Sequence, residues 1–339
     1  MRQVLAAMFD QDASIEVVGV AGDPYIAWEK IQRLDPDVIT LDIEMPRMDG
    51  LTFLAKLMQR RPSRVVMISS LTERGCAATL RALELGAVDF VAKPAVDVAS
   101  GIADMATEIV LKVRAAADAR LRGASGTMVA GVARDQPAEV VHAASSLRAT
   151  HRVIAIGAST GGTEALREVL SELPADSPGV VVVQHMPEKF TRSFAERLNG
   201  LCRIGVSEAR DGDRILPGHA LIAPGGLQMA VTRSGAAYGV RVYAGAPVNR
   251  HRPSVDVLFN SVAACIGSNA VGAILTGMGD DGARGLLAMR ESGARTVAQD
   301  EASCIVYGMP REAVLLGGVD EVLPLERIAG AVLRMASAR

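Results

Sequence analysis

Short apolar stretches alternate with amphipathic stretches in the first part of the chain, between residues 15 and 94. The apolar stretches read IEVVGVA, DVITLDI, RVVMISS and DFVAKP, and most segments between them carry apolar residues at helical spacing. This alternation predicts parallel β/α units with helices on both faces of a sheet. One more helix is predicted over roughly residues 99–121.

A second series of the same kind begins at Val153. Strands are predicted at VIAIG, GVVVVQH, AVGAILTG and RTVAQ, and helical stretches follow most of them. In between, ILPGHALIAPGGLQMAVT and YGVRVYAG alternate and contain turn glycines, which predicts a small antiparallel excursion. Residues 122–150 are small and polar without a sustained period, as in a linker. We therefore expect a domain over 1–121, a linker over 122–150, and a doubly wound, mainly parallel α/β domain over 151–339.

Composition narrows the class of protein. At 339 residues the chain is long enough for two domains, each with its own core. The formal net charge of -2 gives no basic field for a nucleic-acid backbone, so no nucleic-acid partner is expected. The 4 cysteines are widely spaced, which indicates neither a zinc knuckle nor a disulfide framework. The N-terminus lacks a signal-peptide pattern and no apolar run would span a membrane, so we expect a cytoplasmic protein without membrane insertion.

Three polar residues of the first series follow apolar strands: Asp42, Ser69 and Lys93. Open α/β sheets hold their ligands at the carboxyl ends of the strands. An aspartate there can accept a phosphoryl group if a magnesium ion neutralises the oxygens, while the hydroxyl and the ammonium group contact the phosphoryl group. Taken alone, an aspartate after a strand is more often a helix cap.

Together, DIEMPRMDG, SSLT and FVAKP resemble the motifs of the response-regulator receiver family, over roughly residues 1–121. The resemblance implies a flavodoxin-like fold with a five-stranded parallel sheet of order 2-1-3-4-5. It also implies that Asp42 is the phosphoacceptor and a ligand of Mg2+, and that Ser69 is the switch hydroxyl. Lys93 is then the lysine of the site, and Phe90 the aromatic residue that rotates on activation.

The beginning of the chain, MRQVLAAMFDQD, departs from the receiver pattern. A receiver opens with an apolar strand that ends in two acidic residues, and these hold the magnesium ion. The first residues here instead predict the end of a helix, and Asp10 and Asp12 come after that helix, so they cannot replace the pair. Our hypothesis is that Met1 is an internal methionine of a longer chain, with on the order of fifteen to twenty residues absent. If instead the chain is complete, Asp42 is the single carboxylate and phosphorylation is expected to be weak.

A second candidate site lies in VIAIGASTGGTEAL, residues 153–166, where a strand leads through a turn into a helix. Residues 157–161 match the G-x-S-x-G pattern of a nucleophile elbow, with Ser159 as the attacking residue. The same turn of small residues also fits a phosphate cradle at a helix N-terminus. This stretch alone leaves both interpretations open.

A serine nucleophile needs a base and an orienting acid, and both occur at strand ends. His185 follows GVVVVQ, and two adjacent aspartates, Asp280 and Asp281, follow AVGAILTG, where either could cap the next helix. The remaining histidines lie in or beside the linker or in turns, where solvated side chains are expected: His142, His151, His219 and His251. The order Ser, His, Asp differs from that of the α/β-hydrolase fold.

The three segments IGASTGG, VVQHMP and LTGMGDDGARG, on a chain that begins with a receiver, resemble the chemotaxis protein-glutamate methylesterase (CheB) family over nearly the whole length. The resemblance implies a catalytic triad of Ser159, His185 and Asp281. It implies hydrolysis of γ-glutamyl methyl esters on the cytoplasmic helices of chemoreceptors, with release of methanol, and deamidation of receptor glutamines. No cofactor is expected for the esterase. A chemotaxis histidine kinase is implied as phosphodonor, and peripheral association with receptor arrays is expected.

Two other classes of protein fit less well. A transcriptional response regulator requires a helix-turn-helix with basic recognition residues, but residues 150–339 are rich in predicted strands and not notably basic. A dinucleotide-binding domain with GASTGG as its phosphate loop requires an acidic residue at the end of the next strand, where His185 stands instead.

Overall fold

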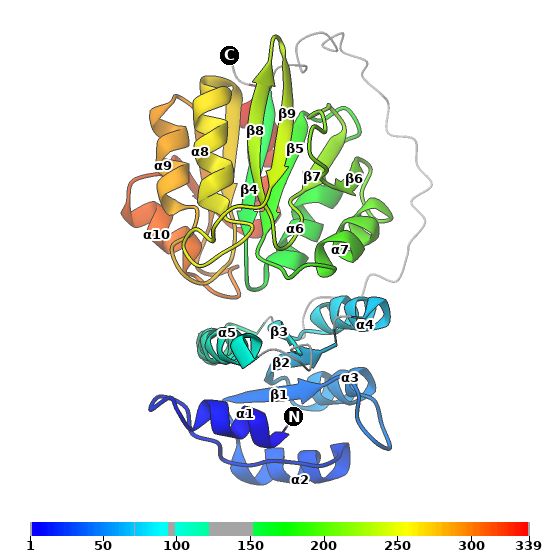
Figure 1. The fold of residues 1–339 in the computed structure, drawn as a ribbon. Coiled ribbons are helices and arrows are strands. Elements are labelled where there is room, and N and C mark those ends of the chain that lie inside the picture. Colours follow the sequence, from blue (N-terminus) through cyan, green and yellow to red (C-terminus); the bar gives the residue numbers. More distant parts are fainter. Residues whose placement is uncertain (1, 71, 94–98, 122–151, 338–339) are drawn as a thin grey trace.

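Two α/β units, one before and one after the predicted linker in the sequence, make up the described structure (Figure 1). The linker itself falls outside the described residues. The structure is a computed structural model that describes residues 2–70, 72–93, 99–121 and 152–337. Among the helices of these segments, none is both long enough and apolar enough to cross a lipid bilayer.

The first unit is built on a parallel sheet with helices packed around it (Figure 1). Its strands, which are adjacent in chain order, are β1 (Val38–Asp42), β2 (Arg64–Ser69) and β3 (Asp89–Ala92). Its helices are α1 (Arg2–Phe9), α2 (Pro24–Leu34), α3 (Gly50–Arg60), α4 (Glu73–Glu84) and α5 (Ala99–Asp118). Polar side chains begin three of them, because Asp23, Asp49 and Thr72 each accept a backbone N–H of the first turn of α2, α3 and α4.

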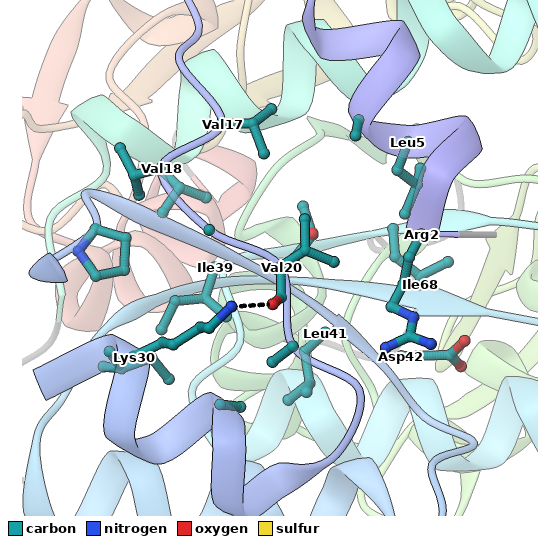
Figure 2. A pocket seen from close by; sticks show the side chains of 18 of the residues that line it. Arg2, Leu5, Val17, Val18, Val20, Lys30, Ile39, Leu41, Asp42 and Ile68 are labelled. Carbon is teal, nitrogen blue, oxygen red and sulfur yellow. Dashed lines mark hydrogen bonds between the residues drawn. The ribbon is translucent and has the colours of Figure 1, made fainter. Parts of the chain in front are cut away.

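The strand predicted over residues 15–21 does not form. This segment passes beside β1, and a cavity of about 470 Å³ separates the two; Figure 2 shows Val17, Val18 and Val20 on one side and Ile39 and Leu41 on the other. In the order 2-1-3-4-5 another strand stands between these two segments, and no described residue fills that place. A strand without a neighbour leaves its backbone groups unpaired. The expected sheet of five strands is therefore a sheet of three in the described residues.

The second unit is a seven-stranded parallel sheet in the order β12-β11-β10-β4-β5-β7-β6. Its strands are β4 (Val153–Ala158), β5 (Gly179–Gln184), β6 (Gly205–Glu208), β7 (His219–Ile222), β10 (Ala270–Ile274), β11 (Arg295–Gln299) and β12 (Glu321–Leu323). The helical elements are α6 (Gly162–Ser171), α7 (Phe190–Asn199), α8 (Val255–Cys265), the 3-10 helix η2 (Gly267–Asn269), α9 (Ala283–Glu291), α10 (Met309–Leu315) and α11 (Leu325–Ser337).

Both faces of this sheet are covered, as the nearly continuous apolar strands predict. Alternate residues of β4 point to opposite faces. Ile154 and Ile156 belong to the core formed with α6, α7 and α11, whereas Val153 and Ala155 belong to the core formed with α8 and α9. The central strands are thus held from both sides, which fixes the position of their carboxyl ends.

The predicted antiparallel excursion is confirmed as a hairpin of β8 (Gln228–Ser234) and β9 (Ala237–Tyr243). It is shorter than predicted. The stretch HALI at 219–222, which we assigned to the excursion, is β7 of the main sheet, parallel to β5 and β6. Its residues after His219 are all buried, as in an interior parallel strand.

Candidate active site

Ser159 lies in a tight turn between β4 and α6. Its backbone N–H donates to Thr276 O at 3.0 Å, and its carbonyl oxygen accepts from Gln184 Nε2 at 2.8 Å. Gly161, which precedes α6, has a φ of 77°, a left-handed conformation that glycine adopts without strain. The strand, turn and helix that the G-x-S-x-G motif requires are therefore all present.

His185 directly follows β5, the neighbour of β4, and its side chain is only 7% exposed. Its Nε2 lies 2.8 Å from Asp281 Oδ2, whereas its buried Nδ1 has no hydrogen-bond partner among the described residues. If Nε2–H donates to the carboxylate, Nδ1 carries the lone pair. Buried polar atoms are rarely left without a partner, so this nitrogen is a candidate for accepting a substrate or nucleophile proton.

Of the two adjacent aspartates, Asp281 is the one that contacts the imidazole. Asp281 is 1% exposed, whereas Asp280 is exposed. Besides His185, four donors reach the Asp281 carboxylate: Asn249 Nδ2 at 2.8 Å, Ser254 Oγ at 2.7 Å, and the backbone N–H groups of Val255 at 2.7 Å and Asp256 at 3.3 Å. Three of these donors lie at the start of α8, where the helix dipole favours negative charge.

The pKa values of two buried carboxyl groups are shifted in opposite directions. Burial alone raises the pKa of a carboxyl group, but at Asp281 the hydrogen bonds from His185, Asn249 and Ser254 outweigh it and hold the pKa well below its usual range. At Asp256, burial dominates and raises the pKa. Asp281 is therefore ionised, and an ionised carboxylate orients the imidazole and stabilises its protonated form.

The three predicted triad residues thus stand at the carboxyl ends of the adjacent strands β10, β4 and β5. In the part of the chain that the structure describes, no hydrogen bond joins Ser159 Oγ to His185. Contacts of this kind often form only when substrate binds, so the unpartnered Nδ1 remains available for the serine hydroxyl. Chemically, a hydroxyl, a free imidazole nitrogen and an ionised carboxylate can perform acyl transfer.

His251 was expected to be a solvated turn residue, and this expectation is wrong. Its ring stacks on that of His185, with the centroids 3.7 Å apart and the planes 8° from parallel. The sequence shows only a histidine in a polar loop, and its contact partner is 66 positions away in the chain, so neither spacing nor motif could reveal it. His219 also differs from expectation, because it lies in β7 and its Nε2 is 2.8 Å from Ser207 Oγ.

In the first unit the structure brings Lys93 to Asp42, as the motifs predicted. Lys93 Nζ lies 2.8 Å from Asp42 Oδ1 and 3.9 Å from Glu44 Oε2. Ser69 ends the neighbouring strand β2, but its hydroxyl is buried and accepts from Thr79 Oγ1 at 2.6 Å. In this conformation the Ser69 hydroxyl is therefore engaged away from Asp42.

The residues that the structure describes do not form a fitting magnesium site. Among the residues described, no group of three or more His, Cys, Asp or Glu side chains is placed to hold a metal ion. Asp12, one of the two acidic residues near the N-terminus, is engaged elsewhere: hydrogen bonds from Ser14 and Arg114 lower its pKa to about 2. Asp42 is left as the single predicted ligand, and it pairs with Lys93.

The first unit contacts the second beside the candidate nucleophile. Thr160, the residue after Ser159, donates through Oγ1 to Oδ2 of Asp89 in β3. The next residue, Phe90, is buried and packs against Phe190 of α7, with ring centroids 4.5 Å apart. The predicted aromatic of the receiver therefore lies in the interface between the two units.

Two ion pairs extend the contact. Arg197 of α7 pairs with Glu84 of α4, and Arg120 Nη2 lies 2.7 Å from Glu301 Oε1. The helices α4 and α7 lie next to each other (Figure 1). The face of the second unit that carries Ser159 is thus joined to the first unit at several points.

Fold and site together define the class: a hydrolase domain built on a parallel sheet between helices, preceded by a receiver-like α/β domain. Family models match both parts, CheB methylesterase over residues 154–332 and the response regulator receiver domain over residues 1–100. The chain belongs to the CheB methylesterase family, and it is an enzyme with a receiver domain and a methylesterase domain. This membership sets aside the transcription-factor and dinucleotide-binding alternatives.

Named relatives extend over the whole chain. The protein-glutamate methylesterase/protein-glutamine glutaminase 2 of Pseudomonas aeruginosa is 59% identical over 339 residues, which are 100% of this chain and 95% of that protein. The protein-glutamate methylesterase/protein-glutamine glutaminase 1 of Xanthomonas euvesicatoria is 57% identical over 338 residues, 99% of this chain and 94% of that protein. The crystal structure of the Thermotoga maritima CheB methylesterase catalytic domain matches with a TM-score of 0.53 and 34% identity, covering 54% of this chain and 98% of that one.

Proposed function

We propose that this enzyme hydrolyses γ-glutamyl methyl esters on the cytoplasmic helices of chemoreceptors, releasing methanol, and deamidates receptor glutamines to glutamate. The names of its relatives include both a protein-glutamate methylesterase and a protein-glutamine glutaminase activity. The observation that carries the proposal is the bond from His185 to Asp281, which leaves Nδ1 free beside the strand end that holds Ser159.

In the proposed reaction, Ser159 Oγ attacks the ester carbonyl carbon while His185 Nδ1 takes the hydroxyl proton. Backbone N–H groups at the start of α6 are suited to stabilise the resulting oxyanion. His185 then donates the proton to the leaving methoxide, so that methanol departs and a glutamyl ester of Ser159 remains. Water, deprotonated by His185, attacks this ester; His185 then returns the proton to the leaving Ser159 Oγ, which releases the free glutamate side chain and restores the enzyme. With a glutamine substrate the leaving group is ammonia, and neither route requires a metal or an organic cofactor.

The receiver is proposed to regulate this reaction. The contact from Asp89 to Thr160, next to Ser159, supports a role as a cover that limits receptor access. Transfer of a phosphoryl group from a chemotaxis histidine kinase to Asp42 would weaken the cover; with Asp42 as the single predicted carboxylate ligand among the described residues, this transfer is expected to be weak. A cytoplasmic location and peripheral association with receptor arrays follow from this substrate and this phosphodonor.

The proposal is tested by methanol release from membranes that carry methylated chemoreceptors. Ser159→Ala removes the attacking oxygen, so we expect methanol release to fall by about 10⁴-fold or more. The matched control is Ser171→Ala on α6, because the Ser171 hydroxyl donates to Glu168 O and contacts none of the candidate groups. Retained activity in Ser159→Ala with an intact fold would remove Ser159 from the mechanism.

A further inference from the structure

A two-residue turn brings two side chains to the His185–Asp281 pair. Val248 and His251 exchange backbone hydrogen bonds of 3.0 and 2.8 Å, and the residues between them, Asn249 and Arg250, have φ values of 49° and 68°. Positive φ at both central positions is the geometry of a type I′ turn, which favours asparagine at the first of them. The two backbone hydrogen bonds therefore fix the position of the turn at both ends.

Two side chains of this turn contact the pair: Asn249 contacts Asp281, and His251 contacts His185. Asn249 Nδ2 donates to Asp281 Oδ1 at 2.8 Å and to Asp256 Oδ2 at 2.7 Å. The His251 ring lies parallel to the His185 ring, with centroids 3.7 Å apart. The backbone oxygen of His251 also accepts from Gln228 Nε2 at 3.2 Å, which anchors the histidine to the hairpin strand β8.

The His251 ring restricts the orientation of the His185 ring in a way that the hydrogen bond to Asp281 does not. The hydrogen bond from His185 Nε2 to Asp281 fixes one atom of the ring, but the ring plane can still tilt about that bond. A parallel ring 3.7 Å away restricts the tilt, and therefore the direction in which the Nδ1 lone pair points. Face-to-face stacking also rules out a proton relay between the two rings, because imidazole hydrogen bonds lie in the ring plane.

His251 is uncharged throughout the pH range in which such an enzyme works. Burial lowers its pKa to about 3; His185, when protonated, and the positive charges of Lys112 and Arg250 act in the same direction, whereas Asp281 opposes them. A neutral aromatic ring stacked on an imidazolium attracts it through its π face. The contact is thus stronger once His185 has taken up a proton than before.

We propose that His251 is a positioning residue for the esterase reaction: its ring holds the plane of His185 and stabilises the imidazolium that forms when Ser159 is deprotonated. This inference rests on the proposed function, since it needs His185 as the base. It predicts an effect on kcat rather than on KM, because the stack acts through His185 and not through the substrate.

The test compares three substitutions of His251 in the full chain, with methylated receptor membranes as substrate. His251→Ala removes the ring and is expected to lower kcat by about tenfold with KM unchanged. His251→Phe keeps a flat, uncharged ring and is expected to restore most of that loss. His251→Leu fills the space without a π face and is expected not to restore it. His219→Ala is the control, since His219 contacts Ser207 and lies outside the site.

Melting temperatures of the variants are measured alongside, so that a loss of kcat can be distinguished from a loss of folded protein. A Leu variant as active as the Phe variant would reduce the role of His251 to space filling and overturn the proposal. Unchanged kcat in His251→Ala, or a loss confined to KM, would overturn it as well. Because the Ser159→Ala variant is assayed in the same series, failure of the esterase mechanism itself would be recognised separately.

Discussion

At the scale of single residues, the hydrogen bonds around Asp281 determine what the neighbouring histidine can do. His185, Asn249, Ser254 and the first backbone N–H groups of α8 all donate to this carboxylate. Each of these bonds favours the ionised form, and together they lower the pKa of Asp281 despite burial. The carboxylate therefore remains charged at any pH at which the imidazole acts as a base.

The lowered pKa of Asp281 predicts how the stability of the folded protein changes in acid. Because the folded-state pKa of Asp281 lies below its unfolded-state value of about 4, the stability it contributes is complete above that value and is lost as the pH falls toward the folded-state pKa. Asp281→Asn has no such charge to lose. We expect wild-type protein to lose more unfolding free energy than Asp281→Asn between about pH 7 and pH 3 in urea titrations.

Asp281→Asn also tests the role of Asp281 in catalysis. Asparagine at position 281 cannot hold the imidazole in the required tautomer, so kcat for methanol release is expected to fall by about 10⁴-fold at neutral pH. Equal acid-induced losses of stability in the two proteins would contradict the assignment of a depressed pKa to Asp281. Near-normal kcat would contradict its role beside His185.

Some of these residues can be predicted from the sequence and others cannot. Ser159, His185 and Asp281 each follow an apolar strand, and parallel strands bring their carboxyl ends together, so their proximity could be predicted. The contribution of Asn249 and His251 could not, because it depends on a turn whose backbone angles no motif encodes. The resemblance already implied Asp281 rather than Asp280, and in the structure Asp281 is the buried one of the two, whereas Asp280 is exposed.

At the scale of secondary-structure elements, whether an apolar segment forms a strand depends on the presence of neighbouring strands with which it can pair. Runs such as 153–158 and 179–184 are apolar on both faces and were correctly predicted as buried parallel strands. Residues 15–21 carry a similar apolar pattern, yet they do not pair with any described strand. The pattern identifies a segment able to form a strand, but the hydrogen bonds come from the partner, and here a cavity stands in the partner's place.

At the scale of the whole molecule, the two domains meet at the face that carries Ser159. The contact combines the Thr160–Asp89 hydrogen bond, the Phe90–Phe190 packing and the ion pair of Glu84 with Arg197. If the receiver limits access to the esterase, weakening this contact should raise activity. The ion pair is suited to this test, because its partners lie on α4 and α7, outside both candidate sites; Glu84 also pairs with Arg81 on its own helix.

We predict that Glu84→Arg raises methanol release by unphosphorylated protein several-fold, about threefold or more, because two like charges then face each other across the interface. The double variant Glu84→Arg with Arg197→Glu restores an opposite pair and should return activity toward the wild-type level. Initial rates with methylated receptor membranes measure both. Unchanged activity in Glu84→Arg, or an increase that the second substitution does not reverse, would contradict a covering role for the receiver.

The most direct measurement of the central claim, that Ser159 is the base-activated nucleophile of this methylesterase, is mass spectrometry after treatment of the full chain with a fluorophosphonate. Such probes react with a serine whose hydroxyl is activated by a neighbouring base. We predict one adduct, on the peptide that contains Ser159, with methanol release falling in proportion to labelling and no adduct in Ser159→Ala. Inactivation with the adduct on another residue, or full labelling of Ser159 with methanol release retained, would contradict the claim.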